Sequence, residues 1–295
     1  MSVGRFAPSP TGPLHFGSLV AAVASYCDAR KRGGQWLLRI EDVDTTRSIK
    51  GASADIIRTL AQYGFVWDGE VVYQSQRSAL YQQVLDQLQA DKLVYACTCS
   101  RKEIADSSTL QGIEGAIYPG TCRIHIAPTD VPAACRLKTH DTEVSFEDVI
   151  QGRQQHHLPT AIGDFVLKRA DGVFNYQLAV VVDDALQGVT HIVRGADLLN
   201  STTRQIHLQQ LLGYVTPVYA HIPVVINSDG QKLSKQTLAQ ALPADNTKAT
   251  LIAALTFLQQ PLPDNMHLFS MDEIWQWAIS HWQLPRIMPA NHSES

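Results

Sequence analysis

Two short segments far apart in the sequence carry side chains suited to binding phosphate. The first, "APSPTGPLHFGSL" at 7–19, surrounds His15 with prolines and glycines, and the second, "KLSK", contains Lys232 and Lys235. Proline fixes the backbone, and glycine lets it approach a ligand closely. Residues 19–32 have apolar side chains at helical spacing, so the first segment leads into a helix N-terminus, where phosphate binds. Either segment alone also fits an ordinary turn or an exposed loop.

A second group of residues suits a metal ion. Cys97 and Cys99 form a C-x-C pair, and Cys122 follows a stretch rich in glycine, serine and threonine. Zinc in a structural site takes four ligands, often thiolates. Spacing alone favours His125, three residues after Cys122, as the fourth ligand. The alternative is three unrelated reduced cysteines. We expect one structural zinc ion.

The segments that must position these residues alternate between strand and helix patterns. The first hundred residues predict strands at 3–6, 35–42 and 71–75 and helices at 19–32, 52–64 and 78–92. After an insertion from Tyr95 to about Pro132, the pattern resumes. It predicts strands at 135–139, 164–169 and 190–195, helices at 176–186 and up to 213, and short helices towards the C-terminus. This order indicates an α/β fold.

Composition limits the class of protein. The 295 residues are 45% hydrophobic and 18% charged, which is typical of a soluble globular protein rather than a disordered one. The sequence shows no membrane-spanning stretch and no apolar signal core, and five cysteines suit a reducing compartment. We therefore expect a cytoplasmic protein with no membrane partner. A net charge of -4 argues against a general nucleic-acid coat but allows a local basic groove.

The phosphate-binding segments resemble the signatures of a known class. The sequence has neither G-x-G-x-x-G nor a Walker lysine loop. Instead, "PLHFGS" and "KLSKQ" resemble the HIGH and KMSKS motifs of class I aminoacyl-tRNA synthetases. The longer strings "RFAPSPTGPLHFGS" and "LRIEDVDTTRS" resemble the glutamyl and glutaminyl branch of that class. The resemblance runs from Val3 to about Gln240, and it implies a Rossmann-type catalytic domain.

The resemblance implies an adenylation reaction, in which an amino-acid carboxylate attacks the α-phosphate of ATP. Such an enzyme works by positioning and charge stabilisation, with magnesium bound to the ATP. His15, Lys232 and Lys235 would be catalytic, with the lysines neutralising charge on the departing pyrophosphate. The implied ATP-binding residues are Pro8, Gly12, His15, Gly17, Ser18 and Lys235. Ser18 departs from the family motif, which often ends in histidine.

The same resemblance implies L-glutamate as the amino acid. An anionic side chain calls for arginine, which can hold a carboxylate through two donors. Arg5 and Arg194 stand at the ends of predicted strands, and Glu41 would pair with the α-ammonium group. The implied glutamate-binding residues are Arg5, Phe6, Ala7, Pro8, Ser9, Glu41, Tyr176 and Arg194. Glutamine is the alternative substrate, and surface or core roles are the alternatives for the single residues.

The resemblance also divides the chain. Residues 1–94 would contain the first catalytic half, and 95–132 a zinc-binding insertion. Residues 133–240 would contain the remainder of the insertion and the second catalytic half, and 241–295 a short helical region without an anticodon-binding domain. Shortened glutamyl-type enzymes use a tyrosine as the fourth zinc ligand, which implies Tyr118 here, with His125 as the alternative. The tryptophans Trp275, Trp277 and Trp282 are expected to pack a helix rather than stack on bases.

The expected lack of an anticodon-binding domain makes the sequence similar to the truncated glutamyl-queuosine tRNA(Asp) synthetases. That family implies transfer of glutamate to the queuosine base in the anticodon loop of tRNA(Asp), by a chain expected to be a monomer. The alternatives are a minimal glutamyl-tRNA synthetase that charges a tRNA 3′ end and a non-catalytic amino-acid or tRNA-binding paralogue. A small-molecule nucleotidyltransferase is a further alternative, but it would not need the glutamate-binding residues together.

Overall fold

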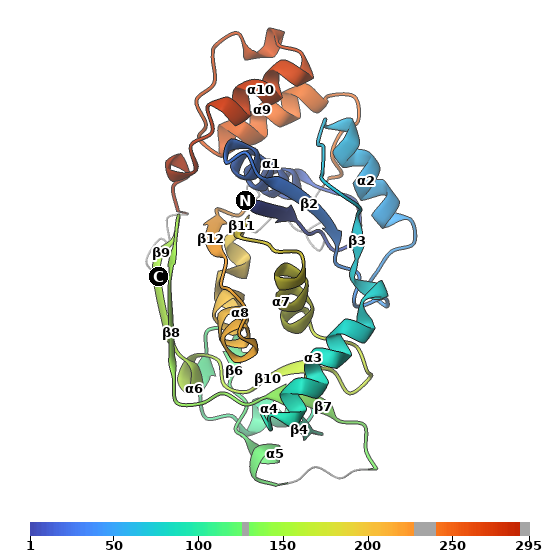
Figure 1. The fold of residues 1–295 in the computed structure, drawn as a ribbon, viewed down its shortest axis with the longest axis vertical. Coiled ribbons are helices and arrows are strands. Elements are labelled where there is room, and N and C mark those ends of the chain that lie inside the picture. The colour runs from blue at the N-terminus through green and yellow to red at the C-terminus, as the bar shows by residue number, and fades with distance from the viewer. Residues whose placement is uncertain (126–129, 227–239, 290–295) are drawn as a thin grey trace.

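Three parallel strands near the N-terminus form the first part of a Rossmann-type sheet. The computed structural model describes residues 1–125, 130–226 and 240–289. Strands β1 (Val3–Phe6), β2 (Gln35–Ile40) and β3 (Val72–Tyr73) pair in that order. Helices α1 (Phe16–Lys31) and α2 (Ala52–Gln62) connect them (Figure 1). The predicted alternation of strands and helices is confirmed for this half.

The second half of the sheet comes from the later part of the chain. β11 (His191–Gly195) and β12 (Val218–Ile222) are parallel, and α7 (Tyr176–Leu186) and α8 (Leu199–Leu212) precede and connect them. The backbone N–H of Thr190 donates to the carbonyl of Val3 at 2.9 Å, which joins the start of β11 to β1. The strand order is therefore β3-β2-β1-β11-β12. In such a sheet, ligands bind where the order reverses, here between the carboxyl ends of β1 and β11.

A small antiparallel sheet forms the lobe inserted between these halves. α3 (Ser78–Ala90) leads into β4 (Val94–Cys97), which pairs with β7 (Ala134–Leu137), and β7 pairs with β10 (Phe165–Lys168). Between β4 and β7 lie α4 (Arg101–Ser107), β5 (Gln111–Gly112), β6 (Gly115–Ala116) and α5 (Thr121–Ile124). The lobe lies at the opposite end of the molecule from the C-terminal helices (Figure 1).

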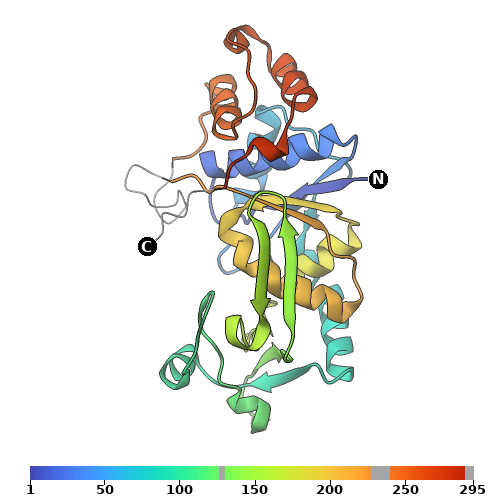
Figure 2. The same cartoon turned by 90° about the vertical axis from the view of Figure 1, so that its left-hand side faces the viewer.

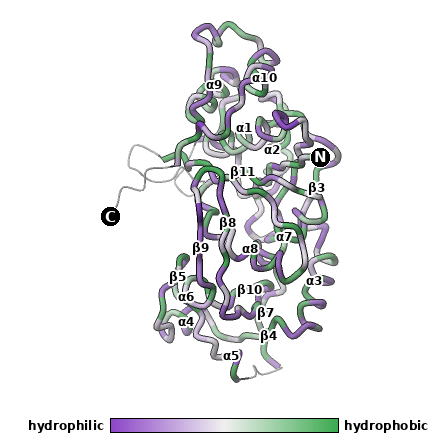
Figure 3. Tube along the Cα trace, turned by 60° about the vertical axis from the view of Figure 1, so that its left-hand side comes forward, coloured by the Kyte–Doolittle hydropathy of each residue, from purple (hydrophilic) through white to green (hydrophobic). Residues whose placement is uncertain are grey.

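One hairpin was not among the predicted elements. β8 (Glu143–Asp148) and β9 (Gly152–His157) pair antiparallel, and α6 (Leu158–Ala161) follows. The end of β8 also pairs with β12, where Asp148 lies opposite Tyr219. The hairpin runs along one side of the molecule (Figure 2). β9 is hydrophilic along its length, and a strand without alternating apolar residues lacks the usual sequence signal (Figure 3).

Two C-terminal helices cover α1 on the far side of the sheet. α9 (Thr247–Phe257) and α10 (Met271–Ser280) pack with α1 around a cluster of aromatic rings. Trp275 is buried, its ring lies 4.9 Å from that of Tyr26, and its indole N–H donates to the carbonyl of Tyr63 at 2.9 Å. Trp282 is also buried, and Trp277 packs against the same cluster. The expectation that these tryptophans pack helices is confirmed.

Short 3-10 helices complete the described chain: η1 (Gln74–Gln76), η2 (Ala196–Leu198), η4 (Met266–Leu268) and η5 (Leu284–Arg286). Among the described residues, none of the helices combines the length and apolar character needed to cross a membrane.

Candidate active site and metal-binding cluster

A cavity of about 130 Å³ lies at the point where the strand order reverses. β1 ends in it, β11 contributes Arg194, and Glu41 directly follows β2. The cavity brings together six of the eight predicted glutamate-binding residues: Arg5, Phe6, Ala7, Glu41, Tyr176 and Arg194. Pro8 lies next to it and accepts the backbone N–H of Glu41 at 3.0 Å. Ser9 lines a neighbouring cavity instead.

Arg5 is held by a buried carboxylate that the sequence analysis did not single out. Its Nε and terminal nitrogen donate to the two oxygens of Asp184 at 3.3 and 3.4 Å. Arg39 also contacts Asp184 at 2.8 Å, and all three side chains are buried. Although burial raises the pKa of Asp184, the two arginines bring it below its usual value. The paired aspartates in "VVVDDAL" were the available sequence signal, since charged residues are rarely buried without partners.

Glu41 gives the cavity an acidic end. Its carboxylate accepts from Arg39 at 3.2 Å and is almost completely buried. Burial raises the pKa of Glu41, and Arg39 and Arg5 counteract that rise. A buried carboxylate of this kind favours an additional cationic partner. The cavity therefore has arginines and an acid in an arrangement that complements a ligand with both a carboxylate and an ammonium group.

Arg194 is held at several of its nitrogen atoms. Nε donates to Nε2 of His221 at 3.0 Å, and one terminal nitrogen donates to Thr202 and Gln205 at 2.8 and 2.7 Å. The other terminal nitrogen lies 3.4 Å from the hydroxyl of Tyr176, which also lines the cavity. Arg194 is thus a buried, oriented cation rather than a surface strand end.

Five of the six predicted ATP-binding residues lie on the segment that leads into α1 or in its first turn. His15 is the N-cap residue of α1, and its backbone pairs with that of Ala241. Gly12 has φ of 146°, which favours glycine. A Cβ atom on Gly17 would lie 3.2 Å from the His15 ring, so glycine leaves room for the imidazole. Ser18 lies in the first turn of the helix. Lys232 and Lys235 lie outside the described residues.

A larger cavity of about 460 Å³ adjoins the first and shares Glu41 and Tyr176 with it. Asp44 accepts from Thr46 at 2.6 Å, Arg47 at 2.9 Å and Arg169 at 2.8 Å. The hydrogen bond from Thr46 and the two arginines hold the pKa of Asp44 below its usual value.

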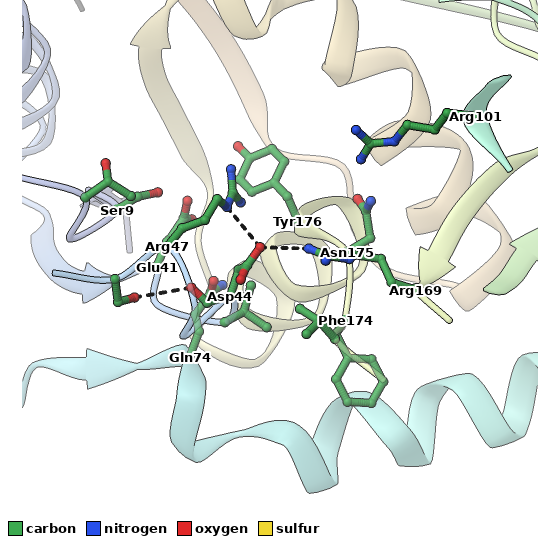
Figure 4. Close-up of a pocket in the computed structure, with 14 residues that line it drawn as sticks. Ser9, Glu41, Asp44, Arg47, Gln74, Arg101, Arg169, Phe174, Asn175 and Tyr176 are labelled. Atoms are coloured by element: carbon green, nitrogen blue, oxygen red, sulfur yellow. Dashed lines mark hydrogen bonds and ion pairs between the residues drawn. The ribbon is translucent and has the colours of Figure 1, made fainter. Parts of the chain in front are cut away.

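Figure 4 shows Arg47, Asp44, Glu41 and Tyr176 converging on this larger cavity, with Arg101 reaching it from the inserted lobe (Figure 4). Asp44 and Arg47 stand in the string "LRIEDVDTTRS", but neither was a predicted site residue. Its dense charge, "EDVDTTR", was the only signal for this cavity.

The three predicted metal-binding cysteines lie together in the inserted lobe. The sulfur atoms of Cys97, Cys99 and Cys122 all lie within 4.8 Å of one another, and those of Cys99 and Cys122 are 3.5 Å apart. The Tyr118 hydroxyl lies 3.6 Å from the sulfur of Cys99. Tetrahedral zinc with Zn–S bonds of about 2.3 Å would place its sulfur ligands roughly 3.8 Å apart, so this donor set fits zinc. His125 is exposed, and this cluster does not include its ring.

Comparison with known proteins agrees with the fold. Residues 2–281 match the family described as tRNA synthetases class I (E and Q), catalytic domain. A glutamate tRNA ligase from Elizabethkingia meningosepticum, solved in complex with its amino acid, superposes with a TM-score of 0.80 at 24% identity. That likeness covers 98% of this chain and 66% of the ligase, so the chain spans about two thirds of that protein's length. The fold and the match define a class I tRNA synthetase of the E and Q type, a ligase.

Relatives that match over nearly the full length of both chains indicate one family within this class. The "Glutamyl-Q tRNA(Asp) synthetase" of Dechloromonas aromatica is 57% identical over 95% of this chain and 93% of that protein. Its namesake from Aromatoleum aromaticum is 56% identical over 96% of this chain and 89% of that protein. The chain belongs to the glutamyl-Q tRNA(Asp) synthetase family.

Proposed function

We propose that the protein activates L-glutamate with ATP and magnesium, forming glutamyl-adenylate and releasing pyrophosphate. The observation that carries this proposal is the small cavity at the reversal of strand order, with Arg5 and Arg194 on its walls and Glu41 beside them. The two guanidinium groups would bind the side-chain carboxylate, and Glu41 would bind the α-ammonium group. The α-carboxylate would then be left to attack the α-phosphate of ATP.

The chemistry of activation needs no nucleophile from the protein. His15, at the N-terminus of α1, would donate a hydrogen bond to phosphate, and the dipole of the helix favours the same negative charge. Lys232 and Lys235 would neutralise the pyrophosphate as its bond to the α-phosphorus breaks. Gly12 and Gly17 keep side chains away from the nucleotide.

We further propose that the activated glutamate is transferred to the queuosine base in the anticodon loop of tRNA(Asp). Support comes from the relatives, which are named glutamyl-Q tRNA(Asp) synthetases, and from the near-complete length over which they match. The larger cavity suits the acceptor because it adjoins the glutamate cavity and contains Arg47, Arg101 and Arg169. Arginine is well suited to a polyanionic ligand, since phosphate contacts supply much of the affinity for nucleic acid.

A structural zinc ion, held by Cys97, Cys99, Tyr118 and Cys122, is the third part of the proposal. These residues come from the end of β4 and the segment after it, the segment after β6 and the start of α5. A metal ion there would tie together parts of the lobe with little apolar core of their own.

Glutamate-dependent exchange of labelled pyrophosphate into ATP tests the activation step. The zinc-loaded protein is expected to exchange with glutamate and more weakly with glutamine, because an uncharged amide gains less from two arginines. A lack of exchange with glutamate would refute activation and would favour a non-catalytic paralogue.

The acceptor is tested with labelled glutamate and tRNA(Asp) with or without queuosine. A parallel sample of each tRNA is treated beforehand with periodate, which destroys the 3′-terminal diol. Periodate also attacks any other vicinal diol, so tRNA whose 3′-terminal adenosine has been removed enzymatically serves as a second control. Incorporation of labelled glutamate that requires queuosine, and that persists in tRNA without its 3′-terminal adenosine, supports transfer to the queuosine base. Label that needs the 3′-terminal adenosine would instead indicate charging of the tRNA 3′ end.

A further inference from the structure

A buried histidine and aspartate lie directly behind Arg194. His221 is in β12 and Asp148 ends β8, and both side chains have no exposed surface. Nδ1 of His221 lies 2.6 Å from Oδ2 of Asp148, and its Nε2 accepts from Nε of Arg194 at 3.0 Å. Hydrogen bonds thus link Asp148 at the end of β8 through His221 to Arg194, which lines the small cavity.

The proton positions along these hydrogen bonds follow from the two end residues. Nε2 of His221 faces Nε of Arg194 at 3.0 Å and the Thr202 hydroxyl at 3.1 Å. Arginine can only donate, whereas a hydroxyl can donate or accept, so the contact with Arg194 requires a lone pair on Nε2. The proton of the neutral ring then lies on Nδ1 and is donated to Asp148. Burial, together with nearby Arg194, lowers the pKa of His221 to about 4 against the opposing effect of Asp148. Asp148 also accepts backbone N–H groups of Ile150, Gln151 and His221 through Oδ1.

Among the described residues, His221 is the hydrogen-bond partner of Nε of Arg194, whereas the other partners bind the terminal nitrogens. Thr202 and Gln205 both bind the same terminal nitrogen of Arg194, and the other terminal nitrogen makes a longer contact of 3.4 Å with the Tyr176 hydroxyl. His221 binds Nε and so fixes the orientation of the plane. The Tyr219 ring stacks on His221 with a centroid distance of 6.0 Å, and Gln151 donates to the His221 carbonyl. His221 is therefore itself held in place.

We propose that Asp148 and His221 are positioning residues that hold Arg194 in the orientation needed to bind the side-chain carboxylate of the amino-acid substrate. This inference rests on the proposed activation of glutamate and assigns its specificity to residues beyond the cavity wall. It predicts that changing either residue weakens glutamate binding while ATP binding is kept.

Three variants test the hydrogen bonds that link Asp148, His221 and Arg194. In Asp148→Asn, the amide can donate to Nδ1 of His221, which moves the ring proton to Nε2. That proton then faces the N–H donor at Nε of Arg194. A wrong tautomer of this kind is known to disable an aspartate–histidine pair. His221→Asn keeps a donor near Asp148 but has no atom that reaches Arg194. His221→Gln places an amide oxygen near the Nε2 position and keeps the acceptor.

We expect Asp148→Asn and His221→Asn to raise KM for glutamate in pyrophosphate exchange by roughly tenfold or more, which corresponds to one lost hydrogen bond to a charged group. KM for ATP should stay near the wild-type value, and His221→Gln should restore most of the glutamate affinity. The control is His156→Asn, because His156 binds Thr203 on α8 at 2.9 Å in a hydrogen bond that does not involve Arg194.

The outcomes distinguish this inference from the proposed function. A wild-type chain without exchange would overturn the activation of glutamate and this inference with it. A wild-type chain that exchanges, with unchanged KM for glutamate in both disrupting variants, would overturn the inference alone. Equal losses for glutamate and ATP, or no rescue by His221→Gln, would also count against it by indicating a general structural role. If Asp148→Asn does not fold, the two His221 variants provide the same comparison.

Discussion

At the scale of single residues, Arg194 offers a direct test of the glutamate cavity. Arg194→Lys keeps a positive charge but removes the atoms that bind His221, Thr202 and Gln205. Lysine has no planar fork of donors, so it cannot hold a carboxylate in the same fixed way. We expect KM for glutamate in pyrophosphate exchange to rise about ten- to a hundredfold.

The matched control is Arg58→Lys, since Arg58 is an exposed arginine on α2 that pairs only with Asp55 among the described residues. Its kinetic constants should equal those of the wild-type chain. A KM for glutamate that is the same in Arg194→Lys and the wild-type chain would show that the guanidinium does not bind the substrate.

Gly17 tests the phosphate-binding segment at the same scale. The added methyl group of Gly17→Ala would lie 3.2 Å from Cε1 and Nδ1 of His15, so the imidazole must shift by a few tenths of an ångström. Alanine is also the better helix former, by up to about 1 kcal/mol. We expect a lower rate of pyrophosphate exchange together with an unchanged or higher melting temperature. A full exchange rate in this variant would show that the position of His15 is not critical.

The residues that the sequence could predict are those that line the small cavity. Arg5, Glu41 and Arg194 were recognisable because they follow or end strands within quoted motifs. Their partners were not: Arg5 meets Asp184 across 179 residues and His221 meets Asp148 across 73 residues. Contacts over such distances depend on how the sheet and hairpin pack, and no local spacing encodes them.

At the scale of elements, the inserted lobe should depend on the proposed zinc site at Cys97, Cys99 and Cys122. Tyr118→Phe removes a hydroxyl that lies 3.6 Å from Cys99 and that accepts the backbone N–H of Cys122 at 2.7 Å. We expect about one zinc ion per wild-type chain, and faster loss of zinc to a chelator from Tyr118→Phe. Metal analysis after a timed chelator challenge measures both.

His125→Ala provides the control for the fourth ligand, because His125 is exposed at the end of α5. It should retain zinc as the wild-type chain does. Zinc kept by Tyr118→Phe but lost by His125→Ala would assign the fourth position to His125. A fully folded, active chain without metal would remove the need for zinc altogether.

Elements differed in how well the sequence predicted them. The helix predicted at 176–186 matches α7, because its apolar run begins after an asparagine that caps it through the backbone N–H of Gln177. The β8–β9 hairpin was missed, because "GRQQHH" in β9 has no apolar side. β9 forms because its backbone pairs with that of β8, and β8 in turn pairs with β12 of the main sheet.

At the scale of the whole molecule, buried charges join segments that the chain order separates. Arg39 in β2 contacts Glu41 and Asp184, and Asp183 beside Asp184 binds Gln74, Arg77 and Tyr81. These contacts connect the first sheet half, α3 and α7. Breaking one buried partner leaves an uncompensated charge, so such a network favours one arrangement of the segments over others.

These buried groups also predict how stability depends on pH. The pKa of His221 in the folded protein is about 4, lowered mainly by burial, against about 6.5 for histidine in an unfolded chain. Between these values the unfolded chain binds more protons, so stability falls as the pH drops from about 6.5 to about 4. The lowered pKa values of Asp148 and Asp184 act in the same direction at lower pH, as their carboxylates take up protons. Glu41 acts in the opposite direction, because its pKa is raised by burial.

The contribution of His221 to this pH dependence can be measured separately from that of the carboxylates. For His221 alone, the free energy of unfolding should decrease by about 2 kcal/mol from pH 7 to pH 5, since each unit of pH inside the window costs about 1.4 kcal/mol. Urea unfolding of the wild-type chain and His221→Gln at both pH values measures this, because glutamine does not titrate. The variant should lose correspondingly less stability over the same interval, whatever its stability at pH 7. Equal decreases in the two proteins would mean that His221 has an ordinary pKa and is not buried as a neutral acceptor behind Arg194.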